Sequence, residues 1–137
     1  MGALLDICVQ DPQRSSLDLR TFVHWLKPAV LHSQFLLLQD EGEVVPSGYV
    51  TWAWVDDATA LRYQNAPRFV LHPSEWHEGL HLVVMDFCVL GDPTRFMRRL
   101  LRCTRHLARR GAASINVCIR DACGLPIRCH SIHPQHD

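Results

Sequence analysis

The sequence lacks long apolar runs, a secretion signal and an excess of either charge. No apolar run among its 137 residues approaches the roughly 18 that a membrane-spanning helix needs. Residues 1–10 contain neither a basic stretch nor a clear cleavage site, so we predict no signal peptide. Basic and acidic residues number 14 each, so the formal net charge is zero, which argues against nucleic acid as a partner. The length fits one globular domain, residues 1–137.

Paired cysteine motifs are also missing, although the sequence contains six cysteines. Without a secretion signal we expect free thiols in a reducing compartment, and therefore a cytoplasmic protein. The last residues could still bind zinc through cysteine and histidine side chains. Zinc modules usually carry a CxxC pair, whereas the spacing here is Cys-x4-Cys-x5-Cys-His, so we predict free thiols and no metal. The residues concerned are Cys118, Cys123, Cys129, His130, His133 and His136.

Apolar periodicity and turn residues predict an α/β protein with a mixed sheet flanked by helices. The first two β-rich segments, separated by turn residues, favour an antiparallel hairpin. Pro28 falls inside the first helix and would kink or split it. Asp92 and Pro93 suit the N-cap and the first residue of the long helix. The predicted helices cover residues 17–32 (with Ser16 as N-cap), 58–64 and 93–110, and the predicted strands cover 34–39, 47–55, 79–87, 114–120 and 125–131.

One carboxylate, Asp86, lies in an otherwise apolar strand segment, 83–87. Burying a carboxylate without a partner costs free energy, so this residue has either a structural partner or a catalytic role. In the structural interpretation, Asp86 pairs with an arginine of the following helix or caps backbone amides. In the catalytic interpretation, it accepts a proton or orients a group that does. The sequence makes Asp86 the first candidate for a catalytic residue.

Seven of the fourteen basic residues lie between Arg95 and Arg110, in the long predicted helix. Five of them recur at three- and four-residue steps and form one stripe, opposite an apolar stripe. Such a basic face is either solvated surface or a binding face for an acidic partner, and arginine can bind phosphate with two hydrogen bonds. Free amides at the start of the helix would add to phosphate binding. The basic stripe is Arg95, Arg98, Arg102, Arg105 and Arg109, and the apolar stripe is Phe96, Leu100, Cys103 and Leu107.

Several short segments occur in the same order as in a known family. They include residues 48–53 with the pattern Tyr-x-x-Trp-Ala, the strand that carries Asp86, and the Gly91-Asp92 turn. With these segments the sequence resembles the RTX toxin-activating lysine acyltransferases of the hemolysin C type, from about Leu17 to about Ile132. The remaining matches are residues 34–38, 60–63, Trp76, 95–99 and 119–121.

The resemblance implies a fold similar to the Gcn5-type N-acetyltransferases, a homodimer and a cytoplasmic location. It also implies transfer of a fatty acyl group from the phosphopantetheine thioester of acyl carrier protein to a lysine of a protoxin, without a permanently bound cofactor. Asp86 stands where the family has its essential aspartate. The acceptor could equally be a small ribosomal peptide. The alternative is a noncatalytic module of the same fold that binds the carrier protein or a peptide.

The family's catalytic histidine, in a Ser-Pro-x-His-Arg stretch before the first helix, has no counterpart in this sequence. No histidine occurs in residues 1–23, and an ungapped alignment backwards from Pro28 places residues 13–15 at that position. Three explanations remain open: His24 or His32 serves instead, Asp86 acts alone, or the activity is lost. We name His24 as the candidate partner of Asp86, because its apolar neighbours predict that it is buried. These neighbours are Phe22, Val23 and Trp25.

The loop before the long helix favours a carrier-protein donor over coenzyme A. N-acetyltransferases that use acetyl-CoA carry a Gly-x-Gly/Ala loop there, whereas residues 89–93 read Val-Leu-Gly-Asp-Pro. The proline removes an amide donor and the aspartate adds negative charge, and both disfavour a bound pyrophosphate. We therefore predict acyl carrier protein as the partner that delivers the acyl group. Its expected contacts are Thr94, Arg95, Arg98 and Arg102.

Overall fold

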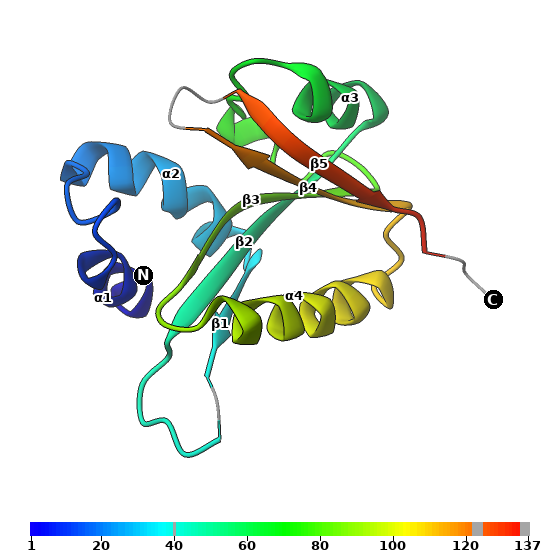
Figure 1. The fold of residues 1–137 in the computed structure, drawn as a ribbon. Helices are drawn as coiled ribbons and strands as arrows, with labels where there is room; N and C mark the ends of the chain where they lie inside the picture. The colour runs from blue at the N-terminus through cyan, green and yellow to red at the C-terminus, as the bar shows by residue number, and fades with distance from the viewer. Residues whose placement is uncertain (40, 122–124, 135–137) are drawn as a thin grey trace. The chain divides into compact units, whose positions relative to one another are not determined.

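The computed structural model describes residues 1–39, 41–121 and 125–134, and at residues 93, 95–97, 101 and 104 it describes the backbone alone. Figure 1 shows the elements in chain order, from α1 at the blue end to β5 at the red end. They are α1 (Gly2–Gln10), α2 (Leu19–Leu31), β1 (Phe35–Leu38), β2 (Gly48–Val55), α3 (Asp57–Asn65), a short 3-10 turn (Pro73–Glu75), β3 (His81–Val89), α4 (Pro93–Ala108), β4 (Ser114–Arg120) and β5 (Pro126–Ile132). The predicted helices and strands are confirmed, with ends shifted by a few residues.

The strands form one mixed sheet in the order β1-β2-β3-β4-β5. β1 and β2 pair antiparallel, which confirms the predicted hairpin. β3 and β4 pair in parallel, with His81 opposite Ser114, and α4 supplies the crossover that a parallel connection needs. β4 and β5 pair antiparallel, with Cys118 opposite Cys129. The predicted mixed sheet with flanking helices is therefore confirmed.

The chain divides into two compact units. The first contains Met1–Trp52 and Met85–Leu101, and the second contains Ala53–Val84 and Arg102–Asp137. Strands β2 and β3 and helix α4 each pass from one unit into the other. The single domain expected over residues 1–137 stays a prediction.

The core of the first unit forms where α1 and α2 pack against side chains of β2 and β3. The sequence pattern does not predict α1, because nine residues give too few turns for a periodic signal. Its buried residues nevertheless recur at helical spacing, so the helix is stabilised by packing. The buried cluster consists of Leu4, Ile7, Cys8, Phe22, Leu26, Tyr49 and Cys88.

Helix α2 differs from the predicted helix at its start and at its proline. Its N-cap is Asp18, whose side chain accepts a 2.7 Å hydrogen bond from the amide of Thr21. The prediction of Ser16 as N-cap is therefore wrong, since aspartate two residues later makes the capping bond. Pro28 lies buried inside the helix, which continues to Leu31 without splitting.

Tyr63 of α3 ties three elements of the second unit together. Its hydroxyl donates to the carbonyl of Val84 on β3 at 2.7 Å and accepts the amide of Cys118 on β4 at 2.9 Å. The guanidinium of Arg120 also lies over its ring, 5.6 Å from the centroid. Tyr63 thus fixes the position of α3 against the two strands.

A disulfide joins Cys118 of β4 to Cys129 of β5. The expectation of free thiols is therefore wrong for these two cysteines. The two residues lie directly opposite each other in the antiparallel pair, an arrangement that depends on the register of strands rather than on spacing in the sequence. Cys8, Cys88 and Cys103 are buried and take no part in a disulfide, and Cys123 lies outside the described residues.

Candidate active site around Asp86

Asp86 lies near the C-terminal end of β3, with its side chain 9% exposed. Both carboxylate oxygens accept hydrogen bonds. Oδ1 accepts from Nη2 of Arg14 at 2.6 Å, and Oδ2 accepts from the hydroxyl of Tyr49 at 2.6 Å and from Nε of Arg14 at 3.4 Å. The prediction that this carboxylate needs a partner agrees with these contacts. The predicted location of an arginine partner on the following helix is wrong, because Arg14 belongs to the segment between α1 and α2.

Arg14 is itself held from two sides. The carboxylate of Asp11 accepts a hydrogen bond from the Arg14 amide at 3.0 Å and another from Nη1 at 3.1 Å. Nη2 also donates to the carbonyl of Phe87 at 2.9 Å. Burial alone would lower the pKa of Arg14, but the hydrogen bond and the charge of Asp86 raise it above its ordinary value. The guanidinium is therefore a fixed and permanent positive charge beside Asp86.

Tyr49 contributes the second donor to Asp86 from β2, where it is fully buried. Its hydroxyl also hydrogen-bonds with Sγ of Cys8, at 3.3 Å. Burial raises the pKa of Tyr49, and the negative charge of Asp86 raises it further. Gly48 lets β2 approach β3 at this point, since a Cβ there would lie 2.8 Å from the carbonyl oxygen of Cys88. The phenol is thus a neutral donor fixed against the carboxylate.

His24 lies on the exposed face of α2, while Phe22 and Leu26 of the same helix are buried. The prediction that His24 is buried is therefore wrong, because apolar neighbours in sequence do not share its face of the helix. Among the described residues, no hydrogen bond joins His24 to Asp86. Its role as catalytic partner stays a prediction.

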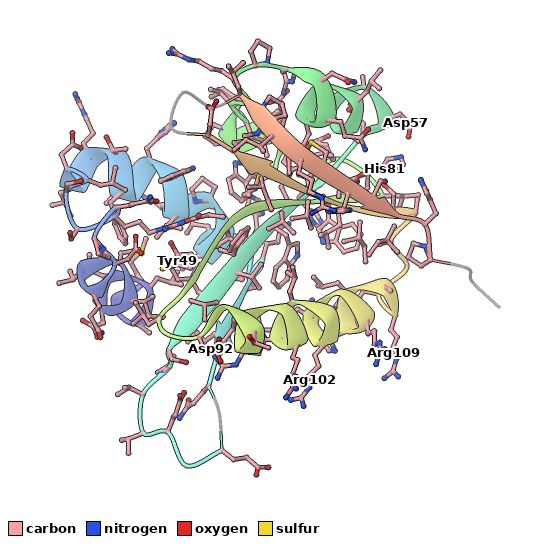
Figure 2. The ribbon with its side chains drawn as sticks, viewed as in Figure 1. Tyr49, Asp57, His81, Asp92, Arg102 and Arg109 are labelled. Atoms are coloured by element: carbon pink, nitrogen blue, oxygen red, sulfur yellow. A yellow bond between two sulfur atoms is a disulfide. The ribbon has the colours of Figure 1, made fainter. Side chains whose placement is uncertain are left out.

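The arginine stripe of α4 is exposed wherever its side chains are described. Arg98, Arg102, Arg105 and Arg109 face solvent, and Figure 2 shows Arg102 and Arg109 extending from the same side of the helix. Cys103 and Leu107 of the opposite stripe are buried, and Leu100 is half-buried. The two-faced helix is therefore confirmed for these residues, while the side chains of Arg95 and Phe96 lie outside the described part.

The start of α4 is capped as predicted. The carboxylate of Asp92 accepts a 2.9 Å hydrogen bond from the amide of Thr94. A phosphate bound at that amide would have to displace the Asp92 carboxylate. The first turn of α4 therefore has fewer free amides for binding an anion than the sequence alone indicates. The exposed arginine side chains become the better candidates for binding an acidic partner.

A second polar cluster, which the sequence does not predict, lies in the second unit. His81 hydrogen-bonds through Nδ1 to Oγ of Ser114 at 2.7 Å and through Nε2 to the carboxylate of Asp57. Figure 2 shows His81 and Asp57 close together. The chain of hydrogen bonds from Asp57 through His81 to Ser114 resembles the arrangement that activates a serine nucleophile. However, Ser114 is only 3% exposed, and its Oγ also accepts a hydrogen bond from Asn116. The cluster therefore links β3, β4 and α3 and does not present a nucleophile.

The described residues contain no helix long and apolar enough to cross a membrane. They also contain no group of three or more histidine, cysteine or acidic side chains placed to hold a metal ion. Of the cysteine and histidine residues considered as zinc ligands, Cys118 and Cys129 are joined to each other, and Cys123 and His136 lie outside the described part.

The structure has a carboxylate held by Arg14 and Tyr49, a five-stranded mixed sheet and a capped basic helix. The model of the RTX toxin acyltransferase family matches residues 1–116. This chain belongs to the RTX toxin acyltransferase family. The match includes Arg14, Tyr49 and Asp86, and it confirms the resemblance noted in the sequence.

Among solved structures, this family member is similar to a chain described as "GphF GNAT-like decarboxylase in complex with isobutyryl-CoA". The TM-score is 0.57 at 17% sequence identity, and the match covers 87% of this chain and 60% of that one. The likeness confirms the predicted fold related to the Gcn5-type N-acetyltransferases. This chain spans less than two thirds of the length of that protein. No curated protein matches the sequence.

Proposed function

We propose that this protein is an acyltransferase that moves a fatty acyl group from acyl carrier protein to the ε-amine of a lysine in a protein or peptide. The observation that carries the proposal is the fixed Asp86 carboxylate in a chain that belongs to the RTX toxin acyltransferase family. Its fold, similar to that of a structure bound to an acyl thioester of coenzyme A, supports thioester chemistry. The acceptor is a toxin or a small ribosomal peptide.

The reaction requires an amine to attack the carbonyl carbon of a thioester. Asp86 offers a negative charge that attracts and orients the amine, and Arg14 offers a positive charge for the oxyanion that forms on the carbonyl oxygen. Among the described residues, Asp11, Asp86 and Phe87 accept from four of the five N–H groups of Arg14, and the fifth, on Nη1, has no acceptor there. The pair therefore has one donor available to a reacting oxygen.

The donor partner is proposed to bind along the exposed arginines of α4. Arg98 and Arg102 lie one turn apart on the exposed stripe and suit the acidic surface of acyl carrier protein and the phosphate of its phosphopantetheine. Arg95 and the amide of Thr94 complete the predicted donor site. We further propose a cytoplasmic location, where acyl carrier protein is present, and a homodimer, as the family resemblance implies. No bound cofactor is needed beyond the thioester donor.

A noncatalytic binding module is the second candidate function. The observation that favours it is that both oxygens of Asp86 already accept hydrogen bonds from Arg14 and Tyr49, as in a structural ion pair. Such a module would bind acyl carrier protein through α4 without turnover.

Intact-mass measurement of a lysine-containing acceptor incubated with acyl carrier proteins of several chain lengths tests the enzyme. The enzyme adds one acyl mass, and Asp86→Ala abolishes the addition, whereas Asp6→Ala, which removes an exposed carboxylate of α1, does not. His24→Ala leaves the addition intact if Asp86 acts without that histidine. Absence of acyl addition with every donor, combined with retained binding of the carrier, would select the noncatalytic module.

Charge reversal tests the donor surface. Arg98→Glu and Arg102→Glu should each weaken binding of acyl carrier protein at least tenfold, because each replaces attraction to an acidic partner by repulsion. Arg20→Glu, an exposed arginine on α2, is the matched control and should leave binding unchanged. Equal effects of all three changes would assign the binding to overall charge rather than to α4.

A further inference from the structure

Among the described residues, the cysteine, tyrosine and arginine groups around Asp86 all have pKa values above their ordinary ones. Burial raises the pKa of the Cys8 thiol, and burial raises the pKa of Cys88 to about 11. The pKa of Tyr49 and the pKa of Arg14 also lie above their ordinary values. No histidine is among the groups that face the carboxylate in the described part of the chain. The titratable and charged groups around it are Arg14 and Asp11 from the α1–α2 segment, Cys8 from α1, Tyr49 from β2 and Cys88 from β3.

The geometry of Asp86 nevertheless leaves room for one further hydrogen bond. A carboxylate offers about four lone-pair sites, two on each oxygen. Arg14 and Tyr49 together use both sites on Oδ2 and one on Oδ1. An N–H of an incoming amine can therefore be accepted at Oδ1, while the carboxylate itself is kept from turning by its other partners.

We propose that Arg14, besides offering its charge to the oxyanion, positions Asp86: it fixes the carboxylate so that Oδ1 orients the acceptor lysine, and the lysine reacts in its neutral amine form, since no histidine faces this carboxylate in the described part of the chain. This inference rests on the proposed acyl transfer. Asp11, which precedes Arg14 by three residues, holds the Arg14 guanidinium in place through two hydrogen bonds. The geometry of the Arg14–Asp86 ion pair therefore exists before the substrate binds.

The bonds balance without a protein base. The amine nitrogen forms the C–N bond to the thioester carbon, and the C–S bond breaks. The proton of the amine leaves to water or hydroxide, and the phosphopantetheine thiolate takes a proton from water. Asp86 accepts a hydrogen bond from the amine throughout and is not itself the final proton acceptor.

The dependence of kcat/KM on pH, measured between about pH 6.5 and 9.5 with a lysine peptide, tests this mechanism. The wild-type value should rise about tenfold per pH unit without a plateau, because the fraction of neutral lysine rises in that way below its pKa of about 10.4. In Arg14→His, an imidazole beside Asp86 can act as a base with a pKa of about 6.5, so the rise should level off above about pH 7.5. Arg14→Lys keeps the charge and should keep the wild-type slope at lower kcat/KM.

An acceptor with a less basic amine provides the matched control. A peptide carrying S-aminoethylcysteine in place of lysine should shift the wild-type profile to lower pH and leave the Arg14→His plateau where it is. Far-UV circular dichroism establishes that each variant is folded.

Three results would overturn the inference. A wild-type profile that levels off near neutral pH would reveal a base in the site. Transfer by Arg14→His alone, with none by wild type at any pH, would reject the neutral-amine mechanism while keeping a competent acyltransferase scaffold. Absence of transfer in both proteins at every pH would reject the proposed acyl transfer, and this inference with it.

Discussion

Tyr49 on β2 donates a 2.6 Å hydrogen bond to Asp86 on β3, and the same hydroxyl lies 3.3 Å from Sγ of Cys8 on α1. A single phenol thus connects the candidate catalytic carboxylate to the helix that begins the chain. Because all three groups are buried, the loss of any one leaves a polar partner without compensation from water.

Tyr49→Phe removes only the hydroxyl from this arrangement. We expect a loss of roughly 1 to 3 kcal/mol in the free energy of unfolding, because a hydrogen bond to a buried charge disappears. Acyl transfer should fall as well, since Asp86 loses one of its two anchors. Urea unfolding and intact-mass kinetics measure the two effects.

Tyr63→Phe is the control for that change. It also deletes a buried hydroxyl with two hydrogen bonds, but those bonds go to Val84 and Cys118. Stability should fall in both variants, whereas transfer should fall only in Tyr49→Phe. An equal loss of transfer in both would show that stability alone governs the activity.

Asp86→Asn leaves the Arg14 guanidinium beside a neutral amide. Breaking a largely buried pair should cost about 3 kcal/mol in the free energy of unfolding. Arg14→Met alone leaves the carboxylate unpaired and should be similarly costly. The double variant should lose clearly less than the two single losses combined, because neither charge then remains. Strict additivity in urea unfolding would contradict a direct energetic link between the two side chains.

Alkaline pH should destabilise the fold through Cys88. Its pKa of about 11 in the folded state lies above the ordinary value, because burial disfavours the thiolate. Cys88 therefore makes its full contribution to the free energy of unfolding below about pH 8.5, where the thiol is protonated in the unfolded chain as well. That contribution is lost as the pH rises toward the pKa of Cys88 in the folded state. Unfolding free energies at pH 8 and pH 10.5 should differ by roughly 1 to 2 kcal/mol more in wild type than in Cys88→Ala. An identical difference in both proteins would assign the alkaline effect to other groups.

Reduction of the disulfide should weaken the second unit. Cys118 and Cys129 are 11 positions apart, and a loop of that size corresponds to about 2 to 3 kcal/mol of stabilisation. Dithiothreitol should therefore lower the urea midpoint of wild type. It should leave the midpoint of the Cys118→Ala/Cys129→Ala double variant unchanged, and a shift there would implicate another cysteine.

Gly48→Ala tests the close approach of β2 to β3. The added methyl group would lie 2.8 Å from the carbonyl oxygen of Cys88, and backbone cannot rotate aside as a side chain can. We expect a loss of about 1 to 3 kcal/mol in stability. Gly42→Ala is not a matched control, because its φ of +85° adds strain of its own, whereas Gly2→Ala meets no neighbouring atom and should be neutral.

The sequence predicts the sheet and the long helix well, because apolar periodicity extends over enough residues in each. It also identifies Asp86, since a carboxylate in an apolar strand is a strong local signal. It does not predict Arg14 as its partner, because a pairing across 72 positions leaves no local pattern. The ungapped alignment identifies only residues 13–15 as the counterpart of the family's histidine.

Other features depend on three-dimensional packing that spacing alone does not encode. Helix α1 is too short to give a periodic signal, and its stability comes from the core that it covers. The disulfide requires the register of β4 against β5, which brings Cys118 opposite Cys129. For His24, the apolar neighbours in the sequence predict burial, but the residue lies on the exposed face of α2.

The separation of Arg14 and Asp86 along the chain has a consequence during synthesis. Ribosomes add about 5 to 20 residues per second, so Arg14 is made roughly 4 to 14 s before Asp86. Throughout that interval Asp11 is already present in the chain, whereas the Asp86 carboxylate is not yet made. The ion pair at the centre of the candidate active site can therefore form only after β3 has been synthesised.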